Sequence, residues 1–376
     1  MTSAAITAGV TREWVVAPDR AGARQRHAST LLAVDDRLLC AWFAGTEEGT
    51  TDNRIYVAAR DAANTWQAPS PIRSTEATAH WNPVLAHAPN GEIWLFFKRG
   101  DRISSWTTWL CTSADGGLSW SDARELVSGD TDPRGPVKNP PVLASDGAWL
   151  APGSTETWNA TGTVWESFVD RSIDGGLTWQ KVAIPLDRSR LTGAGVIQPA
   201  LWAAGTTIGA LLRSSEGCAF VSISTDNGRT FPSALPSSLP NNNSGLTVAS
   251  LPNGLLAAVH NPSTTSWGTR CPLSVAVSAD GHDWQTAVVI EDGRTPLGAF
   301  APSLSAASTT GFEPRDAGVR TDGIGEYSYP AAVVVGEHLI VTYTWQRRAI
   351  VCAAVPLNLL VQPQPNRKAS HDRTNC

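Results

Sequence analysis

SADGGLSW (residues 113–120) and SIDGGLTW (172–179) are two copies of one short pattern, which recurs as STDNGRTF (224–231) and SADGHDW (278–284). A weaker copy, ARDAANTW, covers residues 59–66, and the shared aspartates of the five copies are 54, 59, 52 and 54 residues apart. Self-similarity at this period is typical of propellers and solenoids. In each copy the aspartate is expected to accept backbone N–H bonds, glycine to supply a positive φ and the last aromatic residue to anchor the chain. The pattern therefore predicts a hairpin turn.

A second series of turns counts the repeats independently. Turn residues separate apolar, β-rich runs at six places, which are VDDR (34–37), PNGE (89–92), SDGA (145–148), AAGT (203–206), PNGL (252–255) and VGEH (335–338). Such turns predict hairpins, and six hairpins predict an all-β, six-bladed propeller with about four strands in each blade. The early strand REWVVAP (12–18) is expected to complete the last blade and close the ring.

The repeats place residues 1–360 in a single domain. Residues 294–325 are rich in Gly, Pro, Ser and Ala and fall outside the repeat pattern. They are expected to form a loop insertion, and long insertions of this kind are often lids. The polar tail, residues 361–376, is expected to be disordered.

Composition argues against several classes of function. The net charge is −5 with acids and bases interspersed, so neither a nucleic-acid nor a membrane partner is expected. The N-terminus lacks a positive region followed by an apolar run, which predicts a cytoplasmic protein. The six cysteines show no CxxC or CxxH spacing and the seven histidines show no HxH or HExxH spacing. We therefore expect reduced thiols, no metal, no cofactor and a small-molecule substrate.

Polar and aromatic residues gather near the starts of the predicted blades, in segments that depart from simple strand alternation. Neighbouring blades bring such segments together around one axis, where a propeller is expected to bind its ligand. The set comprises His27, Glu48, Asp52, Trp81, Asn82, Lys138, Asn139, Glu156, Gln198, Arg213, Asn243, His260, Arg270, Glu326 and Tyr327, with Trp106 and Trp158 as further candidates for a pocket wall.

The repeats resemble the Asp boxes of sialidases and related BNR-repeat proteins. The resemblance extends to RHASTLLA, HWNPVL, GPVKNPPV, VIQPAL, LLRSSEG, RCPLSVAVSADG and EYSYPA, which together are similar to a group labelled predicted neuraminidase. It covers roughly residues 25–355. It implies a six-bladed propeller whose site lies where the starts of the inner strands and the connecting loops converge.

The resemblance also implies roles for individual residues. Sialidases hold a carboxylate with three arginines, attack with a tyrosine that a glutamate activates, and use an aspartate as acid and base. Tyr327 in EYSYP matches the tyrosine, and Asp52 in TTDNR matches the aspartate. Arg213 in LLRSS and Arg270 in TRCPLSV match the second and third arginines.

Two positions depart from the sialidase pattern. His27 in RHAST stands where the first arginine is expected, and Gln198 in VIQPAL stands where the activating glutamate is expected. A neutral amide cannot take the proton of a phenol whose ordinary pKa is near 10, and an imidazole cannot make the paired hydrogen bonds of a guanidinium. We therefore expect no hydrolysis of sialic acids and predict that Tyr327 donates a hydrogen bond or positions the substrate.

Simpler structural roles remain open for several of these residues. His27 could satisfy loop carbonyls at a strand end, and Glu48 and Asp52 could stabilise the TEEGTTD loop through local N–H bonds. Lys138 could be a solvated surface charge, and Glu156 could form a buried ion pair with an arginine.

The preferred function is that of a cofactor-free biosynthetic enzyme. Some fungal proteins that resemble this group are hetero-Diels–Alderases, which join a tropolone-type quinone methide to a terpene alkene. Cycloaddition needs no nucleophile, only a shaped cavity and donors that polarise a carbonyl. The expected donors are Tyr327, His27, Arg213, Arg270 and Lys138, and the expected walls are Trp81 and Trp158.

Two alternatives remain beside cycloaddition. One is an exo-glycosidase other than a sialidase, in which Asp52 or Glu48 is the general acid and His27 or Glu156 is the base. Its substrate would be held by the same arginines and lysine. The other is a lectin-like propeller that binds a carbohydrate without turnover.

Overall fold

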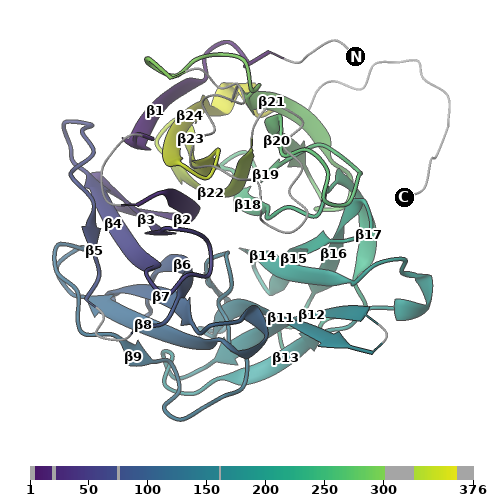
Figure 1. The fold of residues 1–376 in the computed structure, drawn as a ribbon. Coiled ribbons are helices and arrows are strands. Elements are labelled where there is room, and N and C mark those ends of the chain that lie inside the picture. The colour runs from purple at the N-terminus through teal and green to yellow at the C-terminus, as the bar shows by residue number, and fades with distance from the viewer. Residues whose placement is uncertain (1–4, 19–22, 74–76, 161, 301–325, 362–376) are drawn as a thin grey trace, which may run out of the picture.

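The computed structural model describes residues 5–18, 23–73, 77–160, 162–300 and 326–361. Its strands form six antiparallel sheets of four strands each, arranged as the blades of a ring (Figure 1). The six-bladed β-propeller expected from the repeats is therefore confirmed. Most of the predicted insertion and nearly all of the predicted tail, residues 301–325 and 362–376, lie outside the described residues.

Each of the first five blades uses four consecutive strands. Blade I contains β2 (Gln25–Val34), β3 (Arg37–Gly45), β4 (Arg54–Arg60) and β5 (Ser70–Pro71), and blade II contains β6 (His80–His87), β7 (Ile93–Arg99), β8 (Thr107–Ser113) and β9 (Arg124–Glu125). Blade III contains β10 (Val142–Leu143), β11 (Trp149–Asn159), β12 (Gly162–Ser172) and β13 (Gln180–Ile184). Blade IV contains β14 (Val196–Ala204), β15 (Thr207–Ser214), β16 (Cys218–Ser224) and β17 (Leu235–Pro240). Blade V contains β18 (Thr247–Ser250), β19 (Leu256–His260), β20 (Leu273–Ser278) and β21 (Gln285–Glu291).

Blade VI joins the two ends of the chain. It contains β22 (Tyr327–Val335), β23 (His338–Trp345), β24 (Ala349–Pro356) and, as its outer strand, the early β1 (Thr11–Val16). The described residues otherwise include only short 3₁₀ turns, η1 (Ile103–Ser105), η2 (Arg188–Arg190) and η3 (Leu357–Leu359). Among these residues no helix has the length and apolar character needed to cross a membrane.

Both series of predicted turns lie at one end of the ring. The six turns of the second series join the first and second strands of the blades, and the five copies of the repeat join the third and fourth strands. Because the strands are antiparallel, both kinds of turn fall on the same face. The connections between second and third strands and between blades fall on the opposite face.

The repeated turn is held by its aspartate. Asp174 accepts hydrogen bonds from the backbone N–H of Leu177 at 3.1 Å and of Thr178 at 2.9 Å, and from the hydroxyl of Ser172 at 2.8 Å. The hydroxyl of Thr178 also donates to it, and these bonds lower the pKa of Asp174 to about 2. Trp179 ends the turn, with its indole N–H donating to the carbonyl of Gly176 at 3.1 Å. The structural roles expected for this pattern are thus confirmed.

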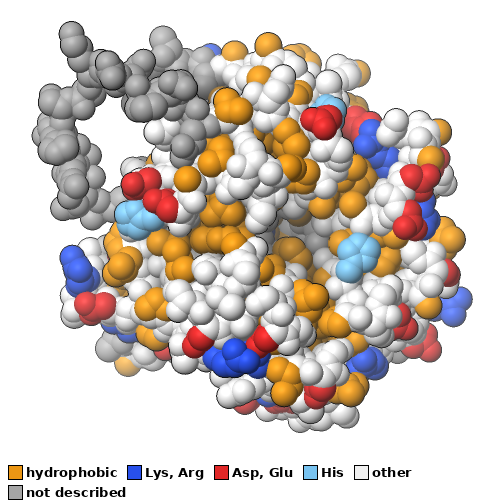
Figure 2. Space-filling model, turned by 180° about the vertical axis from the view of Figure 1, so that it is seen from behind, with side chains coloured by type: hydrophobic (Ala, Val, Ile, Leu, Met, Phe, Trp, Pro, Cys, Tyr) orange, Lys and Arg blue, Asp and Glu red, His pale blue; other side chains and the backbone are white. Residues whose placement is uncertain are grey.

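The turn-bearing face has an apolar centre. Figure 2 shows hydrophobic side chains around a hollow in the middle of this face. A cavity of about 480 Å³ lies there, lined by side chains that include Leu31, Leu85, Leu143, Pro140 and Val333. The charged candidate residues do not line this cavity, so the functional site is sought at the opposite end of the ring.

Ring closure includes a buried ion pair. The guanidinium of Arg12, on β1, pairs with the carboxylate of Glu291, on β21. The hydroxyl of Tyr343, on β23, donates to the same carboxylate at 3.0 Å. Burial raises the pKa of Glu291, against the opposing effect of Arg12, so the carboxylate depends on its partner to stay charged. The first strand of the chain is thereby tied to blades V and VI.

We expect Arg12→Ala to lower the free energy of unfolding by about 3–5 kcal/mol, because it leaves the Glu291 carboxylate buried without its cation. Urea unfolding followed by tryptophan fluorescence measures this loss. The double variant Arg12→Ala/Glu291→Gln should recover part of it, and the variant Arg190→Ala, at an exposed arginine, should stay within about 1 kcal/mol of the wild type. A loss below 1 kcal/mol for Arg12→Ala would show that the pair does not stabilise the closure.

Candidate functional site

A left-handed residue marks the start of every blade. These residues have φ between 41° and 69° and are Ala28, Asn82, Lys138, Gln198, Asn243 and Tyr329. In four blades this place is also a bulge, where the pairing of the first strand with the second skips a residue. A bulge redirects the side chains that follow it, and non-glycine residues with positive φ are uncommon enough to suggest a functional constraint.

Arg213 joins three of these residues at the centre of the ring. Its Nη1 donates to the hydroxyl oxygen of Tyr329 at 2.9 Å and to the amide oxygen of Gln198 at 3.1 Å. Its Nε donates to the amide oxygen of Asn243 at 3.0 Å. Lys138 reaches across from blade III, with its Nζ donating to the carbonyl of Leu246 at 2.7 Å. Side chains from blades III to VI therefore meet at one place.

Among the described contacts, the hydroxyl of Tyr329 meets hydrogen-bond donors and no base. Besides Arg213, the amide nitrogen of Gln198 donates to the phenol oxygen at 3.3 Å. Because the amide oxygen of Gln198 is already bonded to Arg213, the amide meets the phenol only as a donor. The phenol is therefore not prepared for nucleophilic attack, and its own proton can be donated to a ligand.

Tyr327 lies elsewhere. Its ring is fully buried in the core shared by blades V and VI, edge-on to Tyr343 and Trp345, and its hydroxyl accepts a hydrogen bond from the side chain of Gln346 at 3.2 Å. Burial raises the pKa of this phenol. Because β22 bulges just after Ser328, the two tyrosines do not share a face of the strand. The structure thus does not bring Tyr327 to the site, and Tyr329 stands beside Gln198 instead.

Arg213 and Lys138 are buried basic side chains on this side of the site. The guanidinium of Arg213 lies 5.6 Å from the ring centres of both Trp165 and Trp267. Neither cation has a carboxylate within ion-pair distance among the residues that the structure describes. Burial lowers the pKa of Lys138 well below its usual value, and the nearby charge of Arg213 lowers it further. The predicted surface role of Lys138 does not fit this position, whereas an anionic ligand would complement both groups.

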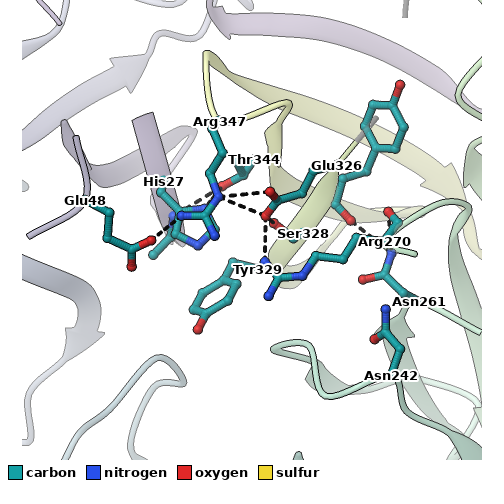
Figure 3. Close-up of polar contacts among 12 residues, drawn as sticks. His27, Glu48, Asn242, Asn261, Arg270, Glu326, Ser328, Tyr329, Thr344 and Arg347 are labelled. Atoms are coloured by element: carbon teal, nitrogen blue, oxygen red, sulfur yellow. Dashed lines mark hydrogen bonds and ion pairs between the residues drawn. The ribbon is translucent and has the colours of Figure 1, made fainter. Parts of the chain in front are cut away.

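His27 is buried and neutral. Its Nδ1 lies 3.0 Å from the hydroxyl oxygen of Thr344, and its Nε2 has no partner among the described residues. Its ring packs against Tyr329, with ring centres 4.3 Å apart (Figure 3). Burial and then the charge of Arg347, followed by those of other central cations, lower the pKa of His27 well below 6.5. His27 therefore offers an uncharged ring nitrogen to the centre of the ring.

Glu326 is the buried anion of the site. It pairs with Arg270, with 2.6 Å between Oε1 and Nη1, and with Arg347, with 2.9 Å between Oε1 and Nε. Ser328 also donates to it at 2.6 Å (Figure 3). Burial raises the pKa of Glu326, but Arg347 and Arg270 outweigh this and hold it at about 2. Glu326 therefore stays ionised and is unsuited to donate a proton.

The two carboxylates of the TEEGTTD loop differ. Glu48 forms an ion pair with Arg347, across the seam between blades I and VI (Figure 3). Asp52 is exposed and accepts hydrogen bonds from the N–H of Thr46 at 2.8 Å and from its hydroxyl at 2.7 Å. These contacts help to lower the pKa of Asp52 despite its partial desolvation. Asp52 thus has the local structural role, and Glu48 belongs to the site.

Glu156 is a carboxylate near Arg213 whose surroundings raise its pKa. It lies on β11 and is partly exposed. Burial is the main cause that raises its pKa, Arg213 opposes the change, and the negative charge of Glu48 raises it further. Glu156 is therefore within electrostatic reach of both, but it makes no ion pair with Arg213 among the described contacts.

The remaining candidates have mainly structural surroundings. Trp81 packs under Gly49 and against Trp106, and its indole N–H donates to the carbonyl of Gly100 at 2.9 Å, so it is no open wall. Trp158 is 58% exposed near the end of β11.

Three polar candidates line the ring from inside. The amide nitrogen of Asn139 donates to the carbonyls of Gln198 and Pro199, at 3.1 and 3.2 Å, and so joins blades III and IV. His260 is buried with Nδ1 3.0 Å from the carbonyl of Pro240, and Asn82 is buried at the start of blade II. No cluster of three or more His, Cys, Asp or Glu side chains that could hold a metal ion occurs in the described part of the chain.

Residues 36–341 match the sequence pattern of the BNR repeat-like domain, and the chain belongs to this family. Solved structures with the same fold include a protein of unknown function from Dyadobacter fermentans, with a TM-score of 0.68, 13% identity, and coverage of 93% of this chain and 100% of that one. The Hadza microbial sialidase Hz136 has a TM-score of 0.66 and 14% identity, covering 93% of this chain and 69% of that one.

The sialidase of Trypanosoma rangeli has a TM-score of 0.65 and 13% identity, covering 94% of this chain and 61% of that one. The chain thus spans less than two thirds of the trypanosomal enzyme. At these identities the likeness shows the fold alone. No curated protein matches the sequence.

Sequence reasoning missed four residues of the site: Tyr329, Arg347, Trp165 and Trp267. Tyr329 had a signal, because Tyr329-Pro330 repeats the Gln198-Pro199 and Asn82-Pro83 pairs at the starts of other blades. Arg347 lies in a turn, Trp267 in a loop and Trp165 in strand β12, and no pattern in the sequence distinguishes them.

Buried neutral histidines predict a loss of stability in mild acid. His260 has a pKa of about 4 in the folded protein, because burial disfavours its charged form. In the unfolded chain the pKa of a histidine is near 6.5. The contribution of His260 to the free energy of unfolding is therefore present above about pH 6.5 and is lost as the pH falls toward 4, because only the unfolded chain takes up the proton. We expect His260→Asn to remove about 1 kcal/mol of the stability loss between pH 6.5 and 5, measured by urea unfolding at both pH values. Identical pH dependence in variant and wild type would contradict this protonation state.

Proposed function

We propose that the protein is a glycoside hydrolase that acts on an anionic sugar derivative without a tyrosine nucleophile. The centre of the ring is lined by charged and amide side chains, which suits a hydroxylated, charged molecule better than an apolar one. Arg213 supplies a buried positive charge for the anionic group of the ligand, and a bound anion would also favour the charged form of Lys138 beside it. The sialidases among the similar structures make glycoside chemistry on this fold plausible, although likeness of fold does not establish activity.

The observation that carries the proposal is the contrast between Glu156 and Glu48. Burial favours the protonated form of Glu156, whereas Glu48 is held in an ion pair with Arg347. Two neighbouring carboxyl groups in such different surroundings fit the acid and the base of a glycosidase. The sequence had suggested Asp52 or Glu48 as the acid and His27 or Glu156 as the base, and the surroundings of Glu48 and Glu156 favour exchanging their roles.

In the proposed step, Glu156 donates its proton to the glycosidic oxygen as the bond from that oxygen to the anomeric carbon breaks. Glu48 accepts a proton from a water molecule, whose oxygen forms the new bond to the anomeric carbon. The products are the free sugar and the alcohol, and one proton has moved from Glu156 to Glu48 through the reaction. Tyr329 and His27 hold oxygen atoms of the substrate by hydrogen bonds.

We expect Glu156→Gln to reduce the hydrolysis of glycosides with poor leaving groups by about 10²–10⁴-fold, because the leaving oxygen then lacks its proton donor. Activated 2,4-dinitrophenyl glycosides should lose much less. A panel of nitrophenyl glycosides that includes uronic acids provides the measurement, with Glu166→Gln, an exposed neighbour on β12, as the matched control. Equal losses for both leaving groups would remove Glu156 from the role of acid.

Tyr329→Phe should keep measurable turnover. Its rate of hydrolysis should fall by about 10-fold, because one hydrogen bond to the substrate is removed. No covalent adduct should form on Tyr329 with a fluorinated glycoside trap, as followed by intact-protein mass spectrometry. The sugar product should show inverted anomeric configuration by NMR. A trapped adduct on Tyr329 would instead restore a tyrosine nucleophile.

Cycloaddition is the second candidate, because the phenol of Tyr329 lacks a base and keeps a proton with which to polarise a carbonyl. The buried position of Trp81 weakens it, since this predicted wall packs within the loops. If no glycoside in the panel is hydrolysed, incubation with a tropolone quinone methide and a terpene alkene tests this candidate. Saturable sugar binding without turnover would instead indicate the lectin-like alternative.

A further inference from the structure

The turn between β23 and β24 has a backbone that its sequence does not favour. Gln346 and Arg347 both have positive φ, 51° and 56°, and the N–H of Arg348 donates to the carbonyl of Trp345 at 3.0 Å. Two successive left-handed residues are typical of a type I′ hairpin turn, for which Asn and Gly are the usual choices. Two long side chains here imply strain that other contacts must offset.

Contacts of the two turn residues supply that compensation. The backbone N–H of Gln346 donates to the carbonyl of Glu326 at 2.6 Å, and its amide donates to the hydroxyl of Tyr327 at 3.2 Å. The Nε of Arg347 donates to both carboxylate oxygens of Glu326, at 2.9 and 3.0 Å. The Nη1 of Arg347 donates to Glu48.

These contacts cross the seam of the ring. Glu48 follows β3 of blade I, Glu326 precedes β22 of blade VI, and Arg270 precedes β20 of blade V. Figure 3 shows Arg347 between the two carboxylates and close to His27. The guanidinium therefore occupies the space beside the histidine that replaces the expected first arginine.

We propose that Arg347 is the positioning residue for Glu48, and that the strained β23–β24 turn exists to place it. This role rests on the proposed function. In it, Arg347 orients the base, Glu48, and does not contact the substrate. A planar guanidinium can hold two carboxylates at fixed angles, whereas a lysine ammonium cannot. Within the loop of residues 46–53, Arg347 holds the side chain of Glu48, so loss of the guanidinium should loosen the loop at this point.

The strain is tested by paired substitutions at neighbouring positions. Arg347→Gly and Arg347→Ala lose the same guanidinium, but glycine relieves the left-handed backbone, so Arg347→Gly should have the higher melting temperature. The backbone of Arg348 is not left-handed, so Arg348→Gly should have a lower melting temperature than Arg348→Ala. A melting temperature for Arg347→Gly at or below that of Arg347→Ala would show that the turn is not strained.

The positioning role is tested without substrate by hydrogen–deuterium exchange of the peptide that covers residues 46–53. Exchange should become at least about tenfold faster in Arg347→Gly and Arg347→Ala, and should not change in Arg348→Ala. Unchanged exchange in the Arg347 variants would overturn the proposal, whatever the fate of the proposed function.

Turnover provides the second readout once the glycoside panel has identified a substrate. Arg347→Gly should lower kcat by about 100-fold with little change in KM, because a misplaced base slows the reaction more than it weakens binding. Arg347→Lys should rescue neither kcat nor loop protection. A rise in KM at unchanged kcat would make Arg347 a binding residue instead. Failure of the whole panel would refute the glycoside function and leave the exchange result to decide the role of Arg347.

Discussion

A backbone constraint repeated in every blade organises this protein. The chain enters each first strand through a left-handed residue, which turns the following side chains out of the alternation of the strand. Gln198, Asn243 and Tyr329 reach Arg213 from three blades because of this reversal. Each left-handed conformation costs of order 1–3 kcal/mol and persists only where the surrounding packing fixes it. The rigid blades therefore stabilise a centre that would not form in an isolated sheet.

Charge is distributed unevenly around that centre. Toward blades V, VI and I, Arg270 and Arg347 are neutralised by Glu326 and Glu48. Toward blades III and IV, Arg213 and Lys138 are held by amide, hydroxyl and carbonyl oxygens, and neither has a carboxylate within ion-pair distance in the described part of the chain. Since a buried charge without a counterion is unfavourable, a ligand should place its anionic group on the second side. Under the proposed function its reacting bond would then lie between Glu156, on blade III, and Glu48, beside blade I.

The fold was readable from the sequence because its determinants are local. An aspartate, a glycine and an aromatic residue within eight positions are enough to specify one turn, and the period of these turns counts the blades. The site was only partly readable, because it depends on which side of a bulged strand a residue falls. Tyr327 and Tyr329 look equivalent in sequence, and a single bulge separates them. The sequence did not indicate Arg347, because its turn lacks the Asn and Gly residues that are typical of such a hairpin turn.

Closure of the ring by β1 has a consequence for how the protein is made. β1 precedes the other strands of the ring in the chain and pairs with β24, which follows them, so β1 is made before its partner strand exists. Contacts of such high sequence separation slow folding. Five blades can assemble in order while the sixth remains incomplete, and during that interval β1 is an unpaired strand that is open to strands of other molecules.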